Sequence, residues 1–133
     1  MNTFSTGQKY FHYLQAQKAL TLVSPIVSDC IKLYQAAQKV HPDDHTTIDY
    51  YHELAARYHT ELSQIGCILR NPANGTVDFP TLYQGRVVAL SWHFGEKKIN
   101  YWHEMQDGFV ARKKITPSFL SEIIIALHQA PTL

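Results

Sequence analysis

Apolar residues recur at alternating spacings of four and three along two stretches of the chain, the spacing of an α-helix that buries one stripe of its surface. In residues 13–41 the repeat consists of Ala16, Leu20, Val23, Val27, Cys30, Tyr34 and Ala37. In residues 47–65 it consists of Ile48, Tyr51, Ala55, Tyr58, Leu62 and Ile65. The segment between them is short and contains Pro42, which disfavours helix at the preceding residue. We therefore expect two antiparallel helices joined as a long helical hairpin.

Pro25 interrupts the first repeat, and two local structures are compatible with it. The helix either kinks there, or a short helix ends near Val23 and a longer one begins with Ser24 as its N-cap. The repeat keeps its phase across the proline, which favours one kinked helix. In the second stretch Thr46 is the expected N-cap, and Gly66 is expected to end the helix.

After Cys67 the pattern changes to short runs of β-branched and aromatic residues separated by turn residues. Extended segments at residues 77–83, 86–94 and 99–105 predict a three-stranded antiparallel β-meander. A tight connection at residues 95–98 is expected to join the last two of these strands.

A last helix is expected at the end of the chain, where Thr116 and Pro117 form a start signal. Its apolar face consists of Phe119, Leu120, Ile123, Ile124 and Leu127. The sequence therefore predicts a single α+β domain over residues 1–133. Its parts are the helical hairpin at 13–65, the β-meander within 75–115 and a C-terminal helix at 116–129.

Composition excludes several classes of protein. An apolar content of 45% and a charged content of 17% are those of a globular chain rather than a disordered one. No apolar run approaches the roughly 18 residues that span a bilayer. The polar segment from Met1 to Tyr10 lacks the apolar stretch of a signal peptide, so a cytoplasmic location is expected. Cys30 and Cys67 would lie roughly 15 Å apart in the predicted hairpin, at ~1.5 Å per residue. Free thiols are therefore predicted.

The charge pattern gives no general attraction to nucleic acid, because the net charge is only +1. The densest positive run, Arg112-Lys113-Lys114, is read as a solvated strand end or loop. Nucleic acid is accordingly not an expected partner.

Trp102-His103-Glu104 is the sharpest local signal for chemistry. A histidine beside a carboxylate is typical of acid–base catalysis or metal ligation. Neighbours on a strand point to opposite faces, however, so His103 and Glu104 share a site only if the strand ends or bulges there. The alternative combines His103 with Asp78 and Arg112, where the carboxylate orients the histidine and the arginine clamps an anion. A buried hydrogen-bond network that locks the sheet to the hairpin is the third interpretation.

The two tryptophans, Trp92 and Trp102, flank the connection at residues 95–98. A two-residue turn would place Trp92 opposite Tyr101, whereas a three-residue loop would make the two tryptophans face each other. They are interpreted either as core residues or as an aromatic platform for a ligand.

Eight histidines are many for this length, and three of them, His45, His52 and His59, recur every seven residues. Two helical turns separate successive members by ~10.5 Å, which one metal ion cannot bridge. We interpret them as a solvated or interface face, with a pH-sensitive association surface as the alternative. No metal site is predicted, and no phosphate-binding, dinucleotide or nucleophile motif identifies a cofactor.

A set of residues in the second half of the chain resembles a family signature. It consists of Asp78-Phe79-Pro80, Gly85-Arg86, Trp92, Gly95-Glu96, Trp102-His103-Glu104, Gly108-Phe109 and Arg112. With Tyr10-Phe11 and residues 16–25, it is similar to a bacterial family, the domain-of-unknown-function family 2203, over residues 10–115. The resemblance implies the architecture and no reaction. Ser91 stands where a cysteine is common in that family, which discounts a catalytic thiol there.

Two classes of function remain open. The chain is either a non-catalytic binding or assembly module, homodimeric through the hairpin and able to bind a small anionic ligand, or a small enzyme. In the second case the small enzyme or metal-dependent hydrolase would use His103 with Asp78 or Glu104. The candidate ligand-binding residues are Arg86, Trp92, Trp102 and Arg112.

Overall fold

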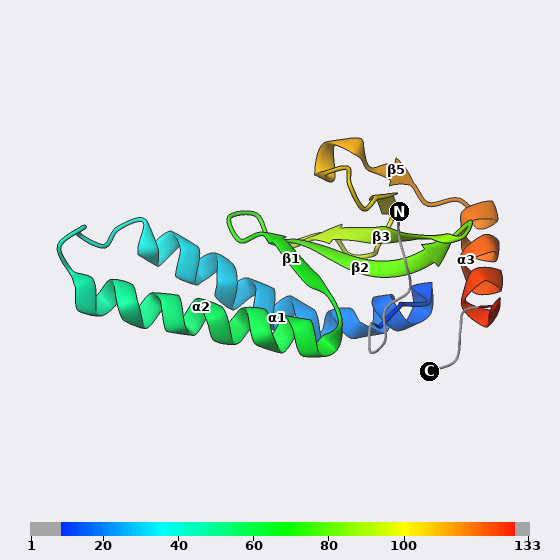
Figure 1. Cartoon of the computed structure of the whole chain (residues 1–133). Helices are drawn as coiled ribbons and strands as arrows, with labels where there is room; N and C mark the ends of the chain where they lie inside the picture. Colours follow the sequence, from blue (N-terminus) through cyan, green and yellow to red (C-terminus); the bar gives the residue numbers. More distant parts are fainter. Residues whose placement is uncertain (1–8, 130–133) are drawn as a thin grey trace.

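The computed structural model describes residues 9–129, and the side chains as far as residue 123 (Figure 1). It confirms an α+β protein with an antiparallel sheet. The elements are α1 (Tyr13–Ala37), α2 (His45–Ile65), β1 (Ile68–Asn71), β2 (Thr76–Tyr83), β3 (Arg86–His93), β4 (Tyr101–Glu104), a 3-10 turn η1 (Phe109–Ala111), β5 (Lys113–Lys114) and α3 (Pro117–Gln129).

Helix α1 is a single helix that continues through Pro25, as the unbroken phase of the repeat predicts. His12 caps its start: a ring nitrogen accepts from the backbone N–H of Leu14, while the Gln15 side chain accepts from the N–H of His12. The helix ends at Ala37 rather than at residue 41. Pro42 thus shortens the helix by a full turn.

Helix α2 starts two residues earlier than expected. Asp44, not Thr46, is the N-cap, and its carboxylate accepts from the N–H of Thr47. That hydrogen bond also lowers the pKa of Asp44. At the other end Gly66 has a φ of +108°, in the left-handed region that glycine adopts at little cost, so the predicted stop is confirmed.

The sheet has five strands, in the order β1-β2-β3-β4-β5, so the prediction of three strands is wrong. The three predicted strands correspond to β2, β3 and β4. The strand β1 was missed because its end, Arg70 and Asn71, is polar and leads directly into the turn that begins at Pro72. The strand β5 consists of two exposed lysines and has no hydrophobic pattern.

The connection between β3 and β4 is longer than the predicted tight turn, because β4 begins only at Tyr101. The register pairs Leu90 with Trp102 and Ser91 with Tyr101, so neither predicted arrangement of the tryptophans is correct. Trp92 and Trp102 lie on the same face of the sheet without facing each other. The connection is fixed to the core instead, because Ile99 is buried and donates its N–H to Gln17 of α1.

The two faces of the sheet have different neighbours (Figure 1). Helix α1 packs on one face, where the rings of Phe11 and Phe79 lie 5.2 Å apart and the hydrophobic core forms. The segment between β4 and β5 lies over the opposite face. Strand β2 is therefore buried on both faces, and this allows polar residues of one face to be enclosed.

Helix α3 closes one end of the sheet. Its Phe119 ring stacks on Trp102 at a centroid distance of 4.6 Å, and Ile123 is fully buried. The predicted apolar face of this helix continues to Ile124 and Leu127, whose side chains lie outside the described residues. Cys30 and Cys67 are both free and buried, as predicted. Among the helices of residues 9–129, none is long and apolar enough to cross a membrane.

Candidate functional site

Asp78 and His103 meet on the sheet face that is turned away from α1. Asp78 pairs with Ser91 of β3, and His103 of β4 pairs with Ala89 two residues along the same strand. The His103 Nε2 atom lies 2.9 Å from Asp78 Oδ1. Both side chains are almost fully buried, with exposed fractions of 3% and 0%. The sequence pattern nominated both residues, and the sheet register brings them together.

The contacts of His103 favour its doubly protonated, imidazolium form. Its Nδ1 atom lies 2.6 Å from the carbonyl oxygen of Glu104, and its Nε2 atom faces the Asp78 carboxylate. Both neighbours are oxygen atoms, and an ionised Asp78 carboxylate beside Arg70 matches a ring that donates from both nitrogens. The hydrogen bond to Asp78 raises the pKa of His103 above its ordinary value of 6.5, although burial acts in the opposite direction.

Arg70 completes a triad that sequence reasoning missed. Its Nε atom donates to Asp78 Oδ2 over 2.8 Å, so the carboxylate is shared between two cations. Leu69 pairs with Val77 and Asn71 with Thr76, which leaves Arg70 as the extra residue of a β-bulge. A bulge redirects the side chain at that position. Here the bulge lies at Arg70, whose side chain reaches the buried carboxylate of Asp78.

A cleft of about 420 Å³ opens above this triad, and we call it the polar cleft. Its lining residues are Arg70, Asn71, Asn74, Thr76, Asp78, His103, Met105, Gln106, Asp107, Gly108 and Phe109. The turn between β1 and β2 supplies one wall, and the segment after β4 supplies the other. Beneath it, Ser91 Oγ is buried and makes no hydrogen bond within residues 9–129.

Glu104 does not share the site with His103. Strand alternation turns it to the core face, where Arg86 donates to both of its oxygens over 2.6 Å. These bonds lower the pKa of Glu104 and raise that of Arg86. The strand neither ends nor bulges between His103 and Glu104, so the pair of adjacent residues cannot act together.

Arg112 does not reach the Asp78–His103 pair either. Of the predicted set of three residues, Asp78 and His103 meet and Arg112 lies elsewhere. Its guanidinium donates to both oxygens of Glu96, over 3.0 and 3.2 Å. It also lies over the rings of Phe109 and Tyr101, at 4.0 and 4.2 Å. Burial is the largest single influence and raises the pKa of Glu96, but the hydrogen bonds from Arg112 and the His93 N–H, together with the charge of Arg112, outweigh it, and the net direction is downward.

The remaining candidate ligand contacts also lie outside the polar cleft. Trp92 is buried in the core, with its ring N–H donated to the carbonyl of Glu96. The Trp102 ring is stacked on Phe119, and the Nζ atom of Lys113 lies 4.7 Å from the centroid of the same ring. Of the four predicted ligand residues, none lines the cleft.

The histidine stripe of α2 is solvent-exposed at His45, His52 and His59. In the part of the chain with described side chains, no three His, Cys, Asp or Glu residues are grouped closely enough to hold a metal ion.

Comparison with known proteins gives one match. The sequence family described as "Uncharacterized conserved protein (DUF2203)" matches residues 9–115. No curated protein and no solved structure matches the chain. The matched range contains every residue of the polar cleft.

Proposed function

The chain belongs to this uncharacterized conserved family, DUF2203, and from the polar cleft we propose that it is a binding module for a small anionic ligand. The observation that carries the proposal is the charge of the triad. Arg70 and His103 are two cations around the single Asp78 carboxylate, so the floor of the cleft has an excess of one positive charge. Burial strengthens the field of the His103 charge, because water screens it less than at the surface. Asp107 also lines the cleft and, like Arg70, is exposed, so its carboxylate offsets part of the positive charge at the mouth.

Arg70 is the residue that would contact the ligand. Asp78 holds its Nε atom and so fixes the plane of the guanidinium. Within the described residues its two terminal nitrogens make no hydrogen bond, and its side chain is 43% exposed. A fixed guanidinium with two free N–H edges suits a carboxylate or phosphate group, which accepts two parallel hydrogen bonds.

The wall of the cleft next to Arg70 offers further donors. The Asn74 side-chain oxygen accepts from both the N–H and the hydroxyl of Thr76, and the Asn71 oxygen accepts from the N–H of Ala73. The oxygens of both amides are therefore used inside the turn. Their NH₂ groups remain as donors, as an anion requires.

The hydrolase alternative is less well supported. A general base needs a free lone pair directed at a substrate, whereas both nitrogens of His103 and both oxygens of Asp78 already have partners. Glu104, the other candidate, is held by Arg86 on the opposite face of the sheet. We therefore assign these residues to orienting Arg70.

The test is a titration of the purified protein with inorganic phosphate and with succinate, followed through backbone amide shifts of Asn74 and Thr76. We expect saturable shifts that weaken about tenfold or more in Arg70→Gln, with Arg70→Lys in between because it keeps the charge and loses the fork. Arg86→Gln is the matched control, since Arg86 is also paired with a carboxylate but lies on the other face. Equal affinity in Arg70→Gln and Arg86→Gln, or the absence of saturable shifts, contradicts the proposal.

Self-association is a second proposal with a separate basis. The homodimer through the helical hairpin is supported by large apolar side chains on the outer surfaces of α1 and α2. Leu14, Leu22 and Tyr50 are exposed by 60%, 63% and 53%. A native mass spectrum that shows twice the 15.3 kDa chain mass, and the single mass for Leu22→Glu, is expected. The single mass for the unmodified chain at micromolar concentration would contradict it.

A further inference from the structure

The apolar repeat of α1 is covered along only part of its length. Its members from Ala16 to Cys30 are buried beneath the sheet, whereas Tyr34 is 39% exposed and Ala37 is exposed. Figure 1 shows the reason, since α1 and α2 extend beyond the sheet. The far end of the α1–α2 pair therefore has an apolar seam that is only partly covered, with Leu69 and Pro72 at its edge.

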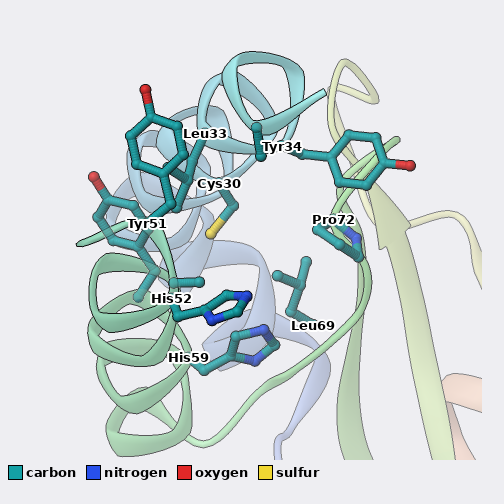
Figure 2. A pocket seen from close by; sticks show the side chains of 11 residues that line it. Cys30, Leu33, Tyr34, Tyr51, His52, His59, Leu69 and Pro72 are labelled. Atoms are coloured by element: carbon teal, nitrogen blue, oxygen red, sulfur yellow. The ribbon is translucent and has the colours of Figure 1, made fainter. Parts of the chain in front are cut away.

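A groove of about 170 Å³ occupies this position, and we call it the apolar groove. Its lining residues are Cys30, Leu33, Tyr34, Ala37, Tyr51, His52, Ala55, Tyr58, His59, Leu69 and Pro72. Figure 2 shows the Cys30 thiol and the rings of His52 and His59 turned toward the same space, with Leu69 across from them. None of these lining residues is an Asp, Glu, Lys or Arg.

The floor of the apolar groove is also uncharged. Burial raises the pKa of the Cys30 thiol to about 11, and the nearby carboxylates of Asp29 and Glu61 add to this effect. The thiol is therefore protonated at neutral pH and acts as a small apolar group. An anionic guest would lose its hydration here without a counter-charge among the lining residues, and the Asp29 and Glu61 carboxylates would repel it, which is costly.

We propose that the apolar groove binds a small uncharged aromatic compound of the size of indole, at a site separate from the polar cleft. The volume of about 170 Å³, partly open to solvent, is close to that of an enclosed apolar cavity of roughly 150 Å³ that holds a benzene molecule, and so suits one ring system. The imidazoles of His52 and His59 supply hydrogen-bonding groups for one polar edge of the guest. Aromatic walls from Tyr34, Tyr51 and Tyr58 favour a flat π-system over an aliphatic chain.

A protein partner fits the groove less well. A stable protein interface buries roughly 1,200–2,000 Å² in total. The apolar groove is instead a single local concavity, large enough for one group. The exposed residues Leu14 and Leu22 lie near the start of α1, away from it.

The test is a titration with indole, followed through backbone amide shifts of Cys30, Tyr34 and Ala55, with indole-3-carboxylate as the charged counterpart. Ala55→Leu places a larger side chain in the apolar groove and keeps a strong helix former. We expect it to weaken indole binding about tenfold or more through overpacking. Ala37→Leu, at the exposed end of α1, is a second filling variant that leaves the core untouched. Ala56→Leu is the matched control, because Ala56 is exposed and does not line the groove.

Three results would overturn the proposal. The first is the absence of saturable indole binding, or equal binding in Ala55→Leu, Ala37→Leu and Ala56→Leu. The second is tighter binding of indole-3-carboxylate than of indole. The third is a dimer of the unmodified chain that Ala55→Leu converts to monomer, because a second copy would then fill the groove. Anion binding at Arg70 is measured independently of all three.

Discussion

The polar cleft and the apolar groove differ in chemistry although one short strand contributes to both. Leu69 of β1 lines the groove, and the next residue, Arg70, lines the cleft. Leu69 is paired with Val77 and follows the strand alternation, whereas Arg70 is the extra residue of the bulge, so this end of β1 lies between a charged site and a neutral one. An edge strand of four residues thus borders two surfaces of different charge. A shift of one residue in its register would exchange the two environments.

Asp78→Ala is expected to give the largest difference between the two sites. It leaves the buried His103 imidazolium and Arg70 without their shared anion, and breaking a buried ion pair costs about 3–5 kcal/mol in the free energy of unfolding. Cys30→Ala, the matched change at the floor of the apolar groove, removes a neutral group and should cost only about 1 kcal/mol. Urea unfolding measures both. Equal costs would mean that charge does not distinguish the cleft from the groove.

A smaller effect is expected from pH. Because the pKa of His103 is raised in the folded protein, its contribution to stability is complete below 6.5 and is lost as the pH rises through the folded-state pKa. The free energy of unfolding should therefore decline on the alkaline side in the unmodified chain. His103→Gln should be less stable near neutrality and show a flatter profile. Urea unfolding between about pH 6 and pH 9 measures both profiles. Parallel profiles of the two proteins would mean that His103 does not cause the decline in stability.

The smallest effect concerns thiol reactivity in the apolar groove and leaves stability unchanged. Burial raises the pKa of Cys30 to about 11 and that of Cys67 to about 12, so both should react slowly with iodoacetamide near neutral pH. Indole should slow the alkylation of Cys30 further and leave Cys67, which does not line the groove, unaffected. Peptide mass analysis over time gives both rates. Equal slowing of the two thiols would mean that indole does not protect Cys30 by binding in the apolar groove.

The elements with a regular pattern could be predicted from the sequence. The phase of the repeat across Pro25 predicts a continuous α1, and Gly66 predicts the end of α2, as the structure has them. Asp78 and His103 were nominated because their residue types suit chemistry, and strand alternation correctly argued against Glu104. These inferences depend only on neighbours in the sequence.

The remaining features depend on contacts between distant residues. Arg70 lies on a short polar strand whose pairing with β2 includes a bulge, and no local pattern encodes that pairing. Arg112 is expected beside His103 and Asp78 but pairs with Glu96, because the sequence does not show how the segment after β4 folds back. An acidic partner for Arg70 could have been sought from hairpin spacing, since Asp78 follows it by eight residues across the Pro72–Gly75 turn.

The protonation state of His103 tests the central claim most directly, because the positive charge of the polar cleft depends on it. Nitrogen-15 NMR of the histidine side chains at neutral pH reports the two ring nitrogens separately. We expect an N–H on both Nδ1 and Nε2 of His103, each in a hydrogen bond. A single N–H and one unprotonated nitrogen would remove the excess cation from the cleft and contradict the assignment of an anion-binding site.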